Sequence, residues 1–305
     1  MSIAERISQS EPVTYGGGRP ALLIGGQQGS LDEVSEMLAG AGIRVAGRCG
    51  ITQAAERLDL QASVGLIWLD CGNEWPGDDV IERTSRLAES GTAVVVEIGR
   101  GLIDATVAAL PESGVQILVD PEPVERVTAL SLALAVQMEP ARVSDVGRDN
   151  AVRLRQLSDE VGRIAVSLAR LSTVPEGADR PALAGRELAK VPQLEGEKVR
   201  AVIRARRLRA RYFNEELFAD PAWDMLLDLL QAEIAQHRVP VSSLCIAAAV
   251  PATTALRWIK TMTDAGLFRR RADPHDGRRI FVELSPDASS AMRQYFAEAG
   301  EVAGL

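Results

Sequence analysis

Between Ala21 and Gln137, five short apolar runs alternate with amphipathic segments, and this alternation restricts the possible folds more than any other feature. The runs lie at 21–24, 43–46, 64–69, 93–96 and 115–119. Continuous apolar runs bounded by Gly, Asp or Pro are typical of parallel strands that are buried on both faces. Between the first two runs, residues 31–38 have helical spacing and are followed by Gly40 and Gly42, which favour a helix end.

Strand–helix units repeated in this way predict a doubly wound, flavodoxin-like α/β domain over residues 19–140, preceded by a flexible N-terminus over 1–18. The loop 25–30 follows the first run and is rich in glycine, but it matches neither G-x-G-x-x-G nor the Walker pattern. We expect a tight turn with Ser30 as the helix N-cap. This loop is also the first place to look for a small ligand, because open α/β sheets bind ligands at the carboxyl ends of their strands.

The third run ends in Asp70, and with this aspartate the segment resembles a response-regulator receiver domain. The resemblance implies that Asp70 would accept phosphate beside Mg²⁺, which an acidic pair holds in that family. Here the first strand ends in Gly25–Gln28, the fourth in Glu97–Gly99 and the fifth in Val119–Pro121, so the acidic pair and the lysine are missing. Mg²⁺ needs carboxylate ligands, and phosphoryl transfer needs its charge neutralised. We expect a degenerate, pseudo-receiver domain in which Asp70 caps the loop 71–76.

A heptad pattern follows between Asn150 and Ser172, within the segment 148–172. Apolar residues recur at alternating steps of three and four, which predicts a helix that pairs with a second copy; the alternative is an amphipathic helix that packs on its own domain. The seam consists of Leu154, Leu157, Val161, Ile164, Leu168 and Leu171.

Residues 173–195 contain three prolines and two glycines, which is typical of a linker. From Lys198 to Arg211 there are then seven cations and no acid. The spacing of Arg200, Arg204, Arg207 and Arg211 places them on one face of a helix. Because like charges repel at this distance, we expect either a phosphate backbone or the acidic N-terminal domain to lie against this face.

The region 196–305 contains the most specific pattern, two short helices joined by a tight turn. A helix that begins at Asp220–Pro221 precedes a short strand at 239–241, a helix from Ser242 with a serine cap, a turn at Val250–Pro251, and a second helix over 253–265. Small side chains occupy the two tight positions, Cys245 and Ala249, the second where glycine is more usual. The residues that we expect to be buried between the helices are Leu244, Ala248, Val250, Ala255 and Trp258.

A predicted hairpin with a basic tip follows Gly266. The string 262–286 resembles the MarR family of winged-helix regulators in Gly266–Leu267, Asp276–Arg278 and Leu284–Ser285. The resemblance implies that Arg278 enters the minor groove from the wing, held by Asp276, while the 253–261 helix face contacts the major groove. It does not extend to the dimerisation helices or the ligand pocket of that family, because only about 15 residues with helical potential follow Pro286.

Charge is divided unevenly along the chain. The net charge is −8, which alone would argue against nucleic acid. Residues 1–140 carry −11, residues 141–195 carry +1 and residues 196–305 carry +2, and such asymmetry is a hint of a nucleic-acid-binding part. Three scattered cysteines and two histidines give no disulfide framework, metal site or catalytic cluster, so we expect no enzymatic activity, no metal and no cofactor. With no signal-like or spanning apolar segment visible, the expectation is a cytoplasmic protein.

Together these features predict a bacterial, homodimeric transcriptional regulator that binds double-stranded DNA. Its N-terminal domain would bind an unknown small ligand or protein. The alternatives are a true response regulator phosphorylated at Asp70, and a module that uses its winged helix to contact proteins. The residues expected at DNA are Ser242, Ser243, Thr253, Thr254, Arg257, Lys260, Thr261, Arg269, His275, Arg278 and Arg279. Arg270 and Arg271 belong to the same charge run, for which the alternative is a solvated strand edge.

Overall fold

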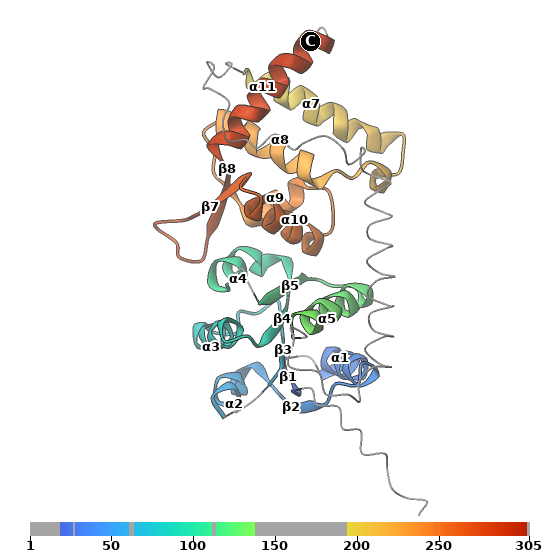
Figure 1. Ribbon diagram of the computed structural model, residues 1–305, viewed down its shortest axis with the longest axis vertical. Helices are drawn as coiled ribbons and strands as arrows, with labels where there is room; N and C mark the ends of the chain where they lie inside the picture. Colours follow the sequence, from blue (N-terminus) through green and yellow to red (C-terminus); the bar gives the residue numbers. More distant parts are fainter. Residues whose placement is uncertain (1–18, 27, 61–63, 112–113, 138–193, 304–305) are drawn as a thin grey trace, which may run out of the picture. The chain divides into compact units, whose positions relative to one another are not determined.

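A computed structural model describes residues 19–26, 28–60, 64–111, 114–137 and 194–303 (Figure 1). The predicted heptad helix and nearly all of the predicted linker lie outside the described residues. The described residues of 1–137 and 191–305 belong to one compact unit. We call 19–137 the α/β region and 194–303 the winged-helix region.

The α/β region is built on a parallel five-stranded sheet in the order β2-β1-β3-β4-β5. This order is that of flavodoxin-like folds, and the arrangement is consistent with that class. The prediction of five parallel strands is confirmed, although the second and third strands begin two residues later and end three residues later than predicted. The strands are β1 (Ala21–Gly25), β2 (Val45–Cys49), β3 (Leu66–Gly72), β4 (Ala93–Ile98) and β5 (Val115–Val119).

Helices cover both faces of this sheet, with α1 and α5 on one side and α2, α3 and α4 on the other (Figure 1). Alternate residues of each strand therefore enter different cores: Leu23 and Trp68 pack with Val34 of α1, whereas Ile67 packs with Val80 of α3. This explains why the strands are apolar on both sides. The helices are α1 (Gln28–Gly40), α2 (Ala54–Leu60), α3 (Asp78–Glu89), α4 (Ile103–Ala109) and α5 (Pro123–Gln137), with 3₁₀ turns η2 (Ile51–Gln53) and η3 (Arg100–Leu102).

The first helix begins earlier than predicted. Since α1 starts at Gln28, Ser30 lies inside its first turn, and the buried Ser30 hydroxyl has no hydrogen-bond partner among the described residues. The expected serine cap is therefore wrong at this position. The end of the helix is as predicted, because Gly42 has φ +75° and donates its N–H to the Ala39 carbonyl at 3.0 Å.

The winged-helix region has a three-stranded antiparallel sheet in the order β6-β8-β7, with helices packed against it. Asp220 caps α8 by accepting the Trp223 N–H at 3.3 Å, and Pro221 occupies the first helical position, as predicted. The elements are α7 (Gly196–Leu208), η4 (Arg209–Arg211), η5 (Glu215–Phe218), α8 (Pro221–Ile234), β6 (Val239–Pro240), α9 (Val241–Ala247), α10 (Ala252–Asp264), β7 (Phe268–Ala272), β8 (Ile280–Leu284) and α11 (Pro286–Ala303).

Two boundaries in this region differ from the sequence prediction. Pro240 is the N-cap residue of α9 and Ser242 lies within the helix, so the second expected serine cap is also wrong. The last helix, α11, is 18 residues long, slightly longer than the remaining helical potential suggested. The core between the helices and the sheet contains Leu227, Leu244, Ile259 and Phe268, each at most 2% exposed.

Candidate nucleic-acid interface

The turn between α9 and α10 fixes the angle of the two helices. Leu244, Ala248 and Ala255 are fully buried there, as predicted, while Val250 is half-buried. Ala249 has φ +53°, the left-handed conformation in which glycine is the usual residue. The backbone conformation therefore explains why glycine is more usual at this position. Trp258 is 37% exposed, so its expected burial is wrong, and the adjacent Ile259 is the core residue of that turn.

The outer face of α10 presents polar and basic side chains. Lys260 and Thr261 are exposed, while Thr254 and Arg257 are half-buried. Lys260 lies 3.1 Å from Asp264 one turn later, and the Thr261 hydroxyl donates to the Arg257 carbonyl at 2.9 Å. These residue types are the ones that contact phosphates and base edges in DNA complexes.

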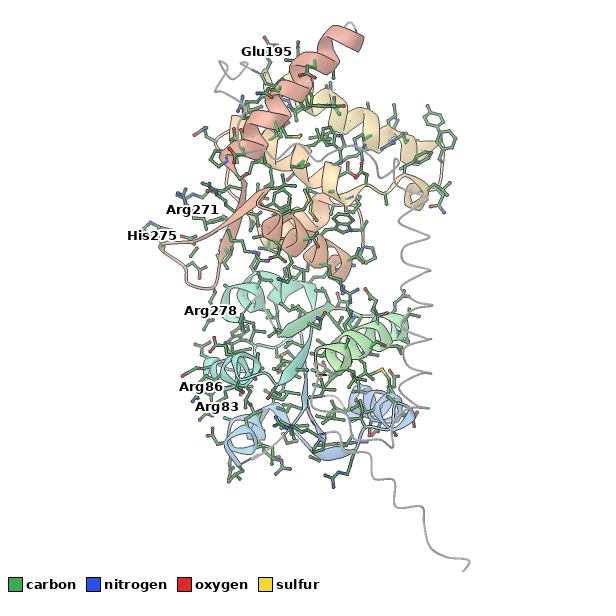
Figure 2. The ribbon with its side chains drawn as sticks, viewed as in Figure 1. Arg83, Arg86, Glu195, Arg271, His275 and Arg278 are labelled. Atoms are coloured by element: carbon green, nitrogen blue, oxygen red, sulfur yellow. The ribbon has the colours of Figure 1, made fainter. Side chains whose placement is uncertain are left out.

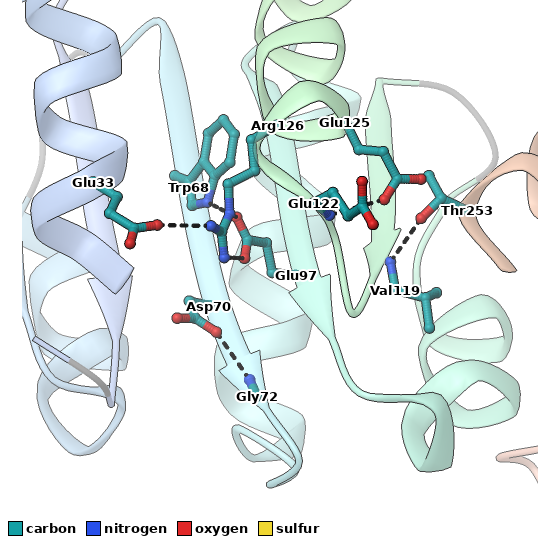
Figure 3. A network of polar contacts seen from close by, with 10 residues as sticks. All are labelled: Glu33, Trp68, Asp70, Gly72, Glu97, Val119, Glu122, Glu125, Arg126 and Thr253. Atoms are coloured by element: carbon teal, nitrogen blue, oxygen red, sulfur yellow. Dashed lines mark hydrogen bonds and ion pairs between the residues drawn. The ribbon is translucent and has the colours of Figure 1, made fainter. Parts of the chain in front are cut away.

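The N-terminal turns of α9 and α10 lie differently from the prediction. Thr253 is only 1% exposed, because its hydroxyl accepts the Val119 N–H of β5 at 3.0 Å (Figure 3). Its expected outward position is therefore wrong in this conformation. Ser242 donates both its N–H, at 2.9 Å, and its hydroxyl, at 2.5 Å, to the carboxylate of Asp104 in α4. Ser243 is exposed.

The hairpin of β7 and β8 is the wing, and Arg271 and His275 extend outward along it (Figure 2). Arg269 and His275 are exposed. Asp276 accepts the backbone N–H of Arg278 at 3.0 Å, but its ion pair, at 3.2 Å, is with Arg279. The Arg278 guanidinium instead lies 3.3 Å from Asp78 in α3, so Asp276 does not hold that side chain. A further ion pair joins Arg271 to Glu283 across the hairpin at 3.6 Å.

The arginines of α7 have acidic partners close by in the same region. Arg200 and Arg204 pair with Glu197 at 2.9 and 2.7 Å, and both lower the pKa of that carboxyl. Arg206 donates to Asp224 of α8 at 2.6 Å. The sequence left DNA and the acidic N-terminal domain as alternative partners for this helix. All ion pairs of α7 among the described residues are with acids of the winged-helix region itself.

At the carboxyl edge of the α/β sheet, a buried ion pair stands beside Asp70 (Figure 3). Arg126 of α5 donates to both carboxylate oxygens of Glu97 at 2.9 and 3.0 Å, and Trp68 donates to the same carboxylate at 2.9 Å. Glu97 is 3% exposed, and burial raises its pKa against the opposing effect of Arg126. Arg126 also reaches Glu33 of α1 at 3.0 Å, so it links three elements.

Asp70 itself is 7% exposed and accepts the Gly72 N–H at 3.0 Å. This contact is the loop cap that the sequence favoured for Asp70. The backbone of Gly25 lies so close that an added Cβ would stand 3.1 Å from the Asp70 Cβ, which explains the glycine in that loop. Phosphorylation of Asp70 would require a metal-binding acidic pair and a lysine nearby. Neither is present at the strand ends.

Residues 226–288 match a family model described as a winged helix DNA-binding domain. This part of the chain is a winged helix. No curated protein matches the sequence. A probable transcriptional regulator from Pseudomonas aeruginosa is 22% identical with a TM-score of 0.22, covering 36% of this chain and 80% of that one.

Two further solved structures resemble parts of the chain. The PcaV transcriptional regulator from Streptomyces coelicolor, in complex with its natural ligand, is 20% identical with a TM-score of 0.21, covering 40% of this chain and 85% of that one. The response regulator StyR is 17% identical with a TM-score of 0.32, covering 80% and 100%. Similarities this weak assign no function. The assignment of residues 226–288 as a winged helix is based on the family model and on the helices and sheet described above.

Three residues that contact the winged helix, Trp75, Asp78 and Asp104, were missed by sequence reasoning. For the two aspartates, the signal in the sequence is the acidic excess of residues 1–140, which does not single out individual carboxylates. Across the described ranges, no group of three or more His, Cys, Asp or Glu side chains could hold a metal ion. In that part of the chain no single helix is long and apolar enough to cross a membrane, although α9 and α10 together pass by length and composition as a pair bent by 107°.

Proposed function

We propose that the protein is a bacterial transcriptional regulator of MarR-like type that binds double-stranded DNA in a sequence-specific manner. The observation that carries the proposal is the basic and hydroxyl surface of α10 and the wing, presented by a winged helix at residues 226–288. Lys260, Arg269, His275 and Arg279 are all exposed on these two elements. Helix α10 would enter the major groove, and the wing would lie along the adjacent backbone and minor groove. Ser243, Thr254, Arg257 and Thr261 complete this surface.

The test is a selection of preferred duplexes from a random 40-base-pair pool with the full chain, followed by gel shift with the selected sequence. The double variant Lys260→Ala/Arg269→Ala should bind at least tenfold more weakly, because each contact to a base or phosphate contributes about 1 kcal/mol or more. The matched control, Arg19→Ala/Arg44→Ala, removes the same charge from the α/β region, where both side chains are exposed. Selection of no duplex, or equal affinity of the two variants, would refute the proposal.

We further propose that the α/β region is a pseudo-receiver that is not phosphorylated and that binds a small ligand or a protein. Glu97 stands where developing phosphate charge would need a cation, and Arg126 is already bound to that carboxylate. Treatment of the folded protein with acetyl phosphate should add no phosphoryl mass. A stable adduct that disappears in Asp70→Asn would instead identify a true response regulator. No catalytic role is proposed for this region.

A homodimer through the heptad helix is the last part of the proposal. Its seam, Leu154 to Leu171, lies outside the described residues, so the support is the sequence pattern alone. The variant Val161→Asp/Ile164→Asp places two charges in the seam and should convert the dimer to a monomer in light scattering. A variant of unchanged mass would exclude this interface. Two winged helices in one dimer would fit half-sites separated by about one helical turn of DNA or a multiple of it.

A further inference from the structure

Three elements of the proposed DNA surface each contact the α/β region within the one compact unit. Helix α9 does so through Ser242, α10 through Thr253 and the wing through Arg278. The partners come from α4, the end of β5 and the start of α3. Helix α7 carries the basic face for which the sequence predicted an acidic partner. Among the described residues, however, α7 forms ion pairs only with acids of the winged-helix region.

The contact at Ser242 has the chemistry of a phosphate contact. Asp104 accepts the Ser242 N–H with one carboxylate oxygen and the Ser242 hydroxyl with the other, at 2.9 and 2.5 Å. Backbone N–H groups and serine hydroxyls are common donors to DNA phosphate oxygens. A carboxylate offers the same kind of paired, negatively charged acceptors, so Asp104 satisfies Ser242 in the way a phosphate would.

The contact at the wing follows the same chemistry. Both carboxylate oxygens of Asp78 lie 3.3 Å from the Arg278 guanidinium, whose carbon is 5.8 Å from the centre of the Trp75 ring. Trp75 in turn donates to Asp78 at 2.7 Å. The acid is thereby oriented toward the arginine, and the aromatic ring adds a cation–π contact. Hydrogen bonding by Trp75 and the charge of Arg278 both lower the pKa of Asp78, so the carboxylate is ionised at neutral pH.

The contact at α10 covers the helix that would enter the major groove. Thr253 becomes buried as its hydroxyl accepts the Val119 N–H at 3.0 Å. On the same helix, one terminal nitrogen of Arg257 is buried and has no hydrogen-bond partner within the part of the chain that the structure describes. A buried guanidinium nitrogen without a partner is costly. DNA cannot occupy the positions of Ser242, Thr253 and Arg278 while these contacts persist.

We propose that the α/β region masks the winged helix by phosphate mimicry, with Asp104 and Asp78 occupying the places of two DNA phosphates. This proposal rests on the proposed function, since it concerns the same surface. The proposal gives the −11 charge of residues 1–140 a role, because the acidic α/β region would compete with DNA phosphates for Ser242 and Arg278. Any ligand or protein that separates the two regions would activate binding, because apparent affinity scales with the fraction of unmasked protein.

The experiment compares two double variants of the full chain, each of which removes two negative charges from the α/β region. Asp78→Asn/Asp104→Asn removes both mimicking carboxylates. Asp32→Asn/Asp59→Asn removes two acids whose partners, Arg48 and Arg83, lie in the α/β region itself. Affinity for a 40-base-pair duplex of mixed sequence is measured by fluorescence anisotropy, and hydrogen exchange of segments 115–119 and 252–257 is measured without DNA.

The first variant should bind the duplex about tenfold more tightly than the control variant, since charge-assisted hydrogen bonds to Ser242 and Arg278 are lost from the masked state only. Its two segments should also exchange faster than those of the control. Equal affinities would overturn the masking role, whatever the exchange rates. If no form of the protein binds any duplex, the proposed function fails and the masking role fails with it. Faster exchange in Asp78→Asn/Asp104→Asn would in that case still show that the two carboxylates hold the regions together. The experiment therefore distinguishes a failure of DNA binding from a failure of the contact.

Discussion

The two regions of this molecule place their charged side chains in opposite ways. At the carboxyl edge of the α/β sheet, Glu97 is 3% exposed and is satisfied by Arg126 and Trp68, all from the same region. On the wing, Arg269 and His275 are exposed and stand along an open hairpin. A polar cluster that satisfies itself serves the fold, whereas one that faces outward is available to a partner. The comparison supports the proposal that DNA recognition lies on the winged-helix region, and it indicates a structural role for the Glu97 cluster.

Removal of Arg126 should have the largest effect on the Glu97 cluster. The variant Arg126→Met leaves Glu97 buried without its cation, and breaking one side of a buried ion pair costs about 3 kcal/mol of unfolding free energy at pH 7. Burial already raises the pKa of Glu97, and without Arg126 that pKa rises further. The folded variant then holds a proton that the unfolded chain has lost, so its stability falls as pH rises from 5 to 7.

Urea unfolding at pH 5 and pH 7 measures this effect. The control is Arg48→Met, which breaks the exposed ion pair with Asp32 and should cost less than about 1 kcal/mol at either pH. If Arg126→Met were no more destabilising than the control, the Glu97 cluster would not be structural and the carboxyl edge would again be a candidate binding site.

Of the fold, the sequence predicted what local pattern determines. The five apolar runs located the five strands, and the cap at Asp220, the stop at Gly42 and the special position at Ala249 were all visible as residue types. The serine caps at Ser30 and Ser242 were wrong, because a hydroxyl near a helix start is compatible with several registers. Trp258 was predicted to be buried, but it is 37% exposed, and the adjacent Ile259 is the residue that faces the core.

Of the candidate site, the sequence could not predict what depends on distant partners. Thr253 has the residue type and spacing of an exposed helix position, yet it is covered by Val119, 134 residues earlier. Arg126 and Glu97 lie on different elements, 29 residues apart, and neither belongs to a motif. Such pairs arise only when the chain has folded, since each partner alone is an ordinary surface residue in the sequence.

A second prediction tests whether the exposed Arg269 of the wing contacts a DNA phosphate. If Arg269 contacts a phosphate, Arg269→Ala should weaken binding to all duplexes alike. It should also lower the slope of log affinity against log salt by about 0.9, the value for one released counterion. Titrations at three salt concentrations measure the slope. Arg44→Ala, an exposed arginine of the α/β region, should leave it unchanged. An unaltered slope for Arg269→Ala would place that side chain outside the interface.

A third prediction concerns the turn between α9 and α10. Because Ala249 has φ +53°, Ala249→Gly removes the strain of a left-handed alanine and should stabilise the protein by about 0.5 to 1 kcal/mol. The same change at Ala205, in the interior of α7, should destabilise it by about 1 kcal/mol. Denaturant midpoints distinguish the two directions, and loss of stability in Ala249→Gly would show that the turn is not strained.

The smallest expected effect compares one buried thiol from each region. Burial raises the pKa of Cys71 and of Cys245 to about 12, and a nearby carboxylate adds to the rise, Asp70 for Cys71 and Asp104 for Cys245. Both thiols should therefore react slowly with iodoacetamide at pH 8, because the thiolate is the reactive form. Asp104→Asn should accelerate Cys245 about twofold and leave Cys71 unchanged, and Asp70→Asn should do the reverse, since desolvation is the larger cause at both sites. Because Asp104 belongs to the α/β region and Cys245 to the winged helix, an effect of Asp104→Asn on Cys245 alone would report the contact between the regions through a single charge. Equal acceleration of both thiols would instead indicate general loosening of the fold.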